Sequence, residues 1–99
     1  MPKRTRGHEK WLLEELEQPE AAAQYLNAAF EDSPKMFLLA LRQVAEARRM
    51  SAVARRAKLS RENLYRTLSK SGNPRLDTLN AVLRVLGLEI AIRPKRQSR

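Results

Sequence analysis

The chain has 99 residues, a single histidine, no cysteine and a formal net charge of +9 at pH 7. This length corresponds to one domain with a modest core, and a chain without cysteine has neither disulfides nor thiolate sites. The sequence pairs no nucleophile with a base and has no glycine-rich phosphate loop, and His8 has no neighbouring ligand, so we expect no enzyme, metal or other cofactor.

Residues 1–8 form a basic arm that we expect to be flexible, and residues 94–99 form a basic tail at the other end. No apolar run of signal-peptide type follows the arm, and no stretch is long enough to span a bilayer. We therefore expect a cytoplasmic protein with no membrane role. Between the two basic ends, residues 9–93 are predicted to form one domain.

Residues 9–32 are predicted to be an acidic helical extension, with seven acids against one lysine. Its first piece, up to Glu17, is amphipathic. Pro19 suits the first turn of a second helix that ends near Glu31, because the missing amide proton of proline would have no partner there. The apolar residues of the two pieces are Trp11, Leu12, Leu13 and Leu16, then Ala22, Leu26, Ala29 and Phe30.

Residues 33–87 are predicted to be the core of the domain. Ser33 is a candidate N-cap and Pro34 a candidate first residue of a helix that runs to about Arg49. The apolar side chains of this helix follow the helical period and should pack on the helices that come next. They are Phe37, Leu38, Leu41, Val44 and Ala45.

Residues 50–75 read as two short helices around a tight turn, which predicts a helix-turn-helix. The first, about Ser51–Ala57, buries its valine and alanines. The second begins at the N-cap candidate Ser60 and turns Leu64 and Leu68 towards the core. Nine bases and one acid lie between Arg48 and Arg75, a clustering that is typical of a protein that binds phosphates.

The second helix of a helix-turn-helix enters the major groove, where its N-terminal residues touch bases. Arg61 suits guanine and Asn63 suits adenine, and together with Glu62 and Arg66 they are our candidate base readers. Candidate phosphate contacts are Ser51, Arg55, Lys58, Ser60, Tyr65, Lys70, Asn73 and Arg75. Two alternatives stay open: a solvated basic helix face, and non-specific binding of nucleic acid through charge alone.

A stop-and-turn signal at residues 71–74 precedes a last helix, from about Arg75 or Leu76 to Leu86, which Gly87 ends. Residues 88–93 then alternate with period two, as a half-buried strand does, and Pro94 follows them. A lone strand leaves its backbone unpaired, so we expect pairing with a copy of itself across a two-fold axis or with an edge strand of another protein. The candidate dimerisation residues are Leu88, Ile90 and Ile92. The alternative is irregular chain packed over the helices.

Residues 36–93 resemble the lambda-repressor-like helix-turn-helix family. Within residues 10–93, the segments YLNAAFED, SRENLYRTLS and GNPRLDTL resemble addiction module antidote proteins. The resemblance implies an all-α lambda-repressor-like bundle with an N-terminal helical extension and one short C-terminal β-strand. It also implies an antitoxin of a type II toxin-antitoxin pair, which neutralises a toxin of the RelE/ParE superfamily and represses the shared operon as a homodimer on inverted-repeat double-stranded DNA.

Two residues depart from the pattern of that group. Ala52 stands where glutamine is common, which weakens the expected base readout. Lys58 stands where glycine is usual, at a cost of about 1 kcal/mol if the backbone is left-handed there. The acidic extension would face a basic toxin, with Trp11, Leu12, Glu15 and Leu16 as candidate contacts. The alternatives are acids that only solvate a helix face, a regulator without a toxin, and a toxin-masking module with weak DNA readout.

Overall fold

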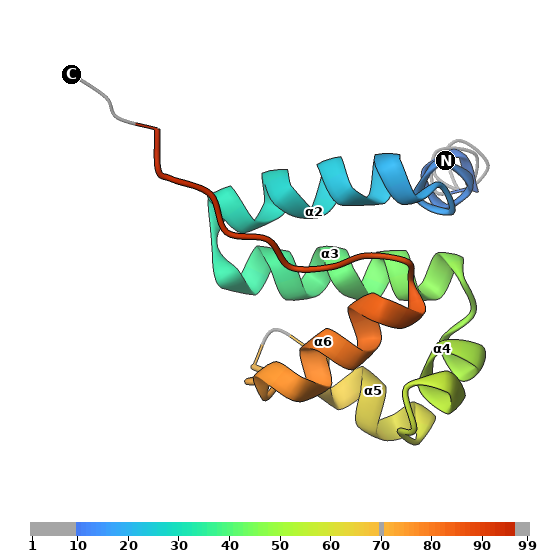
Figure 1. Ribbon diagram of the computed structural model, residues 1–99. Coiled ribbons are helices and arrows are strands. Elements are labelled where there is room, and N and C mark those ends of the chain that lie inside the picture. The colour runs from blue at the N-terminus through green and yellow to red at the C-terminus, as the bar shows by residue number, and fades with distance from the viewer. Residues whose placement is uncertain (1–9, 70, 97–99) are drawn as a thin grey trace.

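The computed structural model describes residues 10–69 and 71–96, and over these residues the protein is helical and contains no strand. Residues 10–16 are helical, and α2 and α3 then lie side by side with the shorter helices packed below them (Figure 1). No helix in the described part of the chain is long and apolar enough to cross a membrane. The labelled helices are α2 (Pro19–Asp32), α3 (Pro34–Ala47), α4 (Met50–Arg56), α5 (Arg61–Thr67) and α6 (Leu76–Val85).

The helix starts follow the local signals in the sequence. Pro19 and Pro34 stand at the first positions of α2 and α3. The Ser33 hydroxyl caps α3 by accepting a hydrogen bond of 3.1 Å from the amide of Met36, which satisfies one of the amides that a helix leaves free at its start. Gly87 has a φ of +79° and ends α6 as predicted. All-α architecture and these boundaries are therefore confirmed.

One core joins the N-terminal extension to the rest of the domain. Leu16 is only 1% exposed and belongs to the same buried cluster as the leucines of α3, α5 and α6. Arg48, which follows α3, donates a hydrogen bond of 3.0 Å to the main-chain oxygen of Glu17. The extension is thus an integral layer of the fold. The fully buried leucines of the cluster are Leu16, Leu41, Leu64, Leu68 and Leu86.

Phe30 is placed differently from our prediction. Its side chain is 59% exposed, although the periodicity of α2 put it on the buried stripe. The ring lies beside that of Phe37, with 5.2 Å between the centroids. Near the end of α2, this contact with α3 still leaves more than half of Phe30 exposed.

The predicted strand at residues 88–93 is wrong for the single chain. These residues are neither helix nor strand, and the segment runs across α3 and α2 (Figure 1). A strand is defined by its hydrogen bonds to a neighbour, and the described part of one chain contains no second extended segment to supply them. The alternative of irregular chain packed over the helices describes the single chain, and Leu88 is the residue that packs against the core.

Candidate nucleic-acid interface

The start of α5 is fixed by its cap. The hydroxyl of Ser60 accepts a hydrogen bond of 3.0 Å from the amide of Asn63, as the sequence predicted. Leu64 is completely buried beneath the helix, so the opposite face is turned to solvent. The four candidate base readers, Arg61, Glu62, Asn63 and Arg66, are each exposed.

Two of the candidate base readers on α5, Arg61 and Asn63, contact neighbouring side chains of the same helix. The guanidinium carbon of Arg61 lies 5.2 Å from the centre of the Tyr65 ring, a cation–π distance. Tyr65 is half-buried and packs against the core, so it gives Arg61 a fixed support. Tyr65 therefore supports the Arg61 side chain, while the predicted phosphate contact of its hydroxyl stays a prediction.

Arg66 donates a hydrogen bond of 3.1 Å from Nη1 to Oδ1 of Asn63. This contact fixes the amide of Asn63, since the oxygen faces Arg66 and the amino group is left as a donor towards solvent. A carbonyl oxygen has two lone pairs, so Oδ1 can still accept from the amino group of adenine while Arg66 stays bound. The amide of Asn63 therefore keeps one donor and one acceptor lone pair, the two groups that an adenine edge would require.

The turn before α5 contains a left-handed lysine. Lys58 has a φ of +64°, which confirms the prediction drawn from its position where related proteins have glycine. The amide of Leu59 donates to the main-chain oxygen of Ala54 at 2.8 Å, closing the end of α4. The conformation costs a non-glycine residue about 1 kcal/mol, and it turns an exposed ammonium outward next to α5.

A second strained residue was not foreseen. Arg49, between α3 and α4, has a φ of +73° and a ψ of 109°, which is disfavoured for any residue with a Cβ. Arginine carries no sequence signal for a positive φ, and the prediction continued α3 to this residue. This backbone geometry turns the chain sharply from α3 into α4, and so it sets the position of α4 and α5.

The remaining candidate phosphate contacts fall into two groups. Ser51 and Arg55 are exposed on α4, and Asn73 is exposed in the loop before α6, as a phosphate contact requires. Ser60 is exposed too, although its hydroxyl is engaged as the cap. Lys70 lies outside the described residues.

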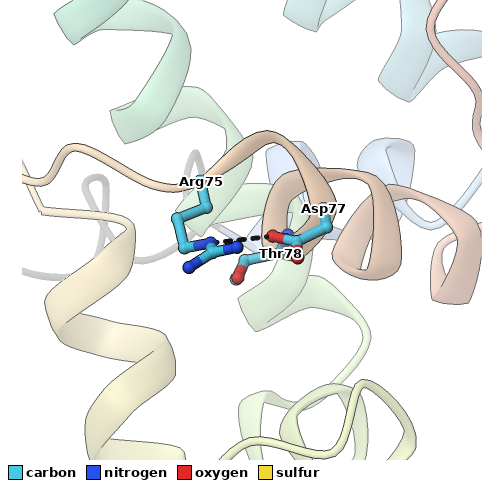
Figure 2. Close-up of polar contacts among 3 residues, drawn as sticks. All are labelled: Arg75, Asp77 and Thr78. Carbon is cyan, nitrogen blue, oxygen red and sulfur yellow. Dashed lines mark hydrogen bonds and ion pairs between the residues drawn. The ribbon is translucent and has the colours of Figure 1, made fainter.

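Arg75 is paired at the start of α6. Its Nε lies 3.3 Å from Oδ1 of Asp77, and the same oxygen accepts a bond of 2.7 Å from the amide of Thr78 (Figure 2). Both side chains of the pair are mostly exposed, so the pairing is weak and solvent-screened. A phosphate would have to compete with Asp77 for Arg75.

Some of the candidate toxin contacts lie in the core and the others lie on the surface. Leu16 is buried, so its prediction as a partner contact is corrected: it holds the extension onto the domain. Leu12 is half-buried and packs against the same core. Trp11 is 57% exposed and Glu15 is exposed, so these two remain on the surface. This short helix has apolar residues on several sides, so the sequence alone could not show which of them is buried.

Comparison with known proteins identifies the family. Residues 10–94 match the model of the family described as probable addiction module antidote protein. The chain belongs to this family. A protein of Haemophilus influenzae described only as uncharacterized is 40% identical to this antidote-family chain over 86 residues, which cover 86% of the chain and 89% of the relative. No solved structure matches the antidote-family chain.

Proposed function

We propose that this protein is the antitoxin of a type II toxin-antitoxin module and represses its operon by binding inverted-repeat DNA as a dimer. The observation that carries the DNA-binding part is the exposed face of α5, where Arg61, Asn63 and Arg66 are held by their neighbours. The antitoxin part is supported by membership of the antidote family. The finer assignment, a toxin of the RelE/ParE superfamily, rests on the resemblance of the sequence motifs.

In this proposal α5 enters the major groove and the other basic residues contact the DNA backbone. Arg61 donates to guanine and Asn63 pairs with adenine. Arg55 and Lys58, both exposed on α4 and its turn, bind phosphates beside α5. Such contacts fix the register of the protein, while the bases supply the sequence preference.

The toxin would meet the helix of residues 10–16. Glu14 and Glu15 are exposed there, next to a Trp11 that is 57% exposed. Large aromatic residues in an acidic surrounding are suited to anchor a basic partner. The rival explanation, acids that only solvate the helix, predicts that these residues can be reversed in charge without effect on any partner.

The DNA-binding part is tested by titrating the purified protein with its own upstream DNA and with scrambled DNA of equal length across a series of salt concentrations. A preference for the upstream DNA that persists at physiological salt is the expected result. Equal binding to both, falling steeply with salt, would show a purely electrostatic interaction. That result would favour the toxin-masking module, which the presence of Ala52 in place of an amide side chain also favours.

The toxin part is tested with the product of the gene adjacent to this one. Since Leu16 belongs to the core, deleting the extension would damage the fold, so we choose the surface variant E14K/E15K. The matched control is E31K/D32K, which reverses two exposed acids at the far end of α2. We expect only the first variant to lose the complex. If the wild-type protein does not bind its neighbour, the protein is a regulator without that partner.

A further inference from the structure

An apolar groove of about 640 Å³ lies between α2, α3, α6 and the segment that follows α6. Its walls include Leu26, Phe37 and Leu79, and Phe30 and Leu76 stand on it with more than half of their side-chain surface exposed. Residues 88–91 form one border of the groove. Exposed apolar surface of this kind, rimmed by polar residues, marks an interaction site.

The bordering segment has an unpaired backbone. Leu88 donates to the main-chain oxygen of Leu83 at 2.8 Å, and after it residues 89–96 make no main-chain hydrogen bond with the described residues. Ile90 lines the groove, whereas Ile92 is 94% exposed. A row of free amides and carbonyls next to an exposed isoleucine is the template for pairing with another extended chain.

The segment is complementary to itself. If two copies run antiparallel about a two-fold axis at Ala91, Ile90 of one copy stands opposite Ile92 of the other, and Glu89 stands opposite Arg93. Both isoleucine pairs then share one face, and both ion pairs share the other. With the axis at Ile90 instead, Glu89 would face Ala91 and Arg93 would face Gly87, so the charge pairing would be lost.

Pro94 selects the hydrogen-bonding pattern of this arrangement. Opposite residues in an antiparallel pair alternate between those that exchange hydrogen bonds and those that do not. Proline has no amide proton, so it fits the second class, which it would share with Ile90 and Ile92. Glu89, Ala91 and Arg93 are then the residues that exchange hydrogen bonds.

We propose that residues 88–93 of two copies pair antiparallel about Ala91 and that Ile92 of each copy enters the groove of the other. The groove is reached because Ile92 of the second copy lies opposite Ile90, which lines it. This inference rests on the dimer of the proposed function and specifies its register and occupant. A second copy is favoured over a foreign segment because the charges and isoleucines match within this sequence.

The register is tested by reversing the charges of Glu89 and Arg93. The quantity measured is the dissociation constant of the dimer, by sedimentation equilibrium without DNA or toxin. E89R and R93E each place like charges opposite one another twice per dimer, so each alone should dimerise about tenfold more weakly or worse. Mixed together, E89R and R93E restore both opposite-charge pairs, so the mixture should dimerise about as well as the wild type. A mixture no stronger than its components, or single variants that dimerise normally, would overturn the register.

A cysteine experiment tests the same axis by geometry. The chain has no cysteine, so A91C introduces one thiol that should lie about 5.5 Å, between Cα atoms, from its counterpart and form a disulfide on mild oxidation. The control R96C sits on the same segment, five residues from the axis, and should lie about 34 Å from its counterpart. Equal cross-linking of both variants, or none, would overturn the proposal. Neither experiment includes DNA, so both can be interpreted even if the protein fails to bind its operator.

A foreign occupant gives a different result. If the groove receives a segment of the neighbouring toxin, the protein alone stays monomeric, A91C does not cross-link, and Ile92 is protected from solvent only in the complex.

Discussion

Replacing Ile92 by alanine should weaken the dimer without weakening the fold of the single chain. The side chain is 94% exposed, so the unfolding free energy of the monomer should change by less than about 0.5 kcal/mol. In the proposed dimer the same side chain is buried. Alanine lacks three of its carbons, and at about 0.8 kcal/mol per buried carbon the loss is at most about 2.4 kcal/mol per copy.

Two copies of Ile92 are buried per dimer, which sets an upper bound of about 5 kcal/mol. Area-based values exceed measured effects on association, so we expect about 2 kcal/mol, a roughly thirtyfold increase in the dissociation constant. Sedimentation equilibrium measures this constant, and denaturant unfolding at low protein concentration measures the monomer. The matched control is Met36→Ala, an exposed apolar residue that does not line the groove. An unchanged constant for Ile92→Ala, or an equal loss for Met36→Ala, would refute the reasoning.

Three further substitutions follow from the described contacts. Asn63→Ala should cost about 1 to 3 kcal/mol on the operator and little on scrambled DNA, measured by titration; equal losses would show that Asn63 reads no base. Lys58→Gly should raise the unfolding free energy by up to about 1 kcal/mol, because it relieves the φ of +64°, and should lower the salt dependence of DNA binding by about one phosphate contact. Gly72→Ala should destabilise the protein by about 1 to 3 kcal/mol in denaturant unfolding, because a Cβ there would lie 2.3 Å from the main-chain oxygen of Thr67; an unchanged midpoint would mean that the loop shifts freely.

The features that sequence predicted are those set by neighbouring residues. Ser33 and Ser60 cap helices because their hydroxyls reach an amide three residues on. Gly87 ends α6 because glycine adopts a positive φ at no steric cost. The left-handed Lys58, by contrast, was predicted from the resemblance, because related proteins have glycine at that position. The exposed face of α5 followed once Leu64 was assigned to the core.

Features that depend on distant contacts were harder to predict. Leu16 and Trp11 lie on one short helix, and only the packing of the shared core decides that the leucine is buried. Arg49 adopts a positive φ at the junction of α3 and α4, and arginine gives no local signal for that conformation. The strand at residues 88–93 was predicted from a pattern that needs a neighbouring strand, and residues 10–69 and 71–96 of the single chain supply none.

The helix that carries Glu14 and Glu15 and the helix that carries the candidate base readers lie on opposite sides of α3. In Figure 1 the helix of residues 10–16 lies beyond α3 from α5, and Leu16 ties it into the shared core, so the separation is fixed. A toxin bound at Glu14 and Glu15 would therefore leave α5 uncovered. A basic toxin would also neutralise the acids that repel DNA phosphates, so the electrostatic part of operator binding should strengthen when the toxin is bound. If the protein is the dimeric repressor that we propose, its complex with the toxin should repress at least as well as the free dimer, unless the toxin displaces the second copy from the groove.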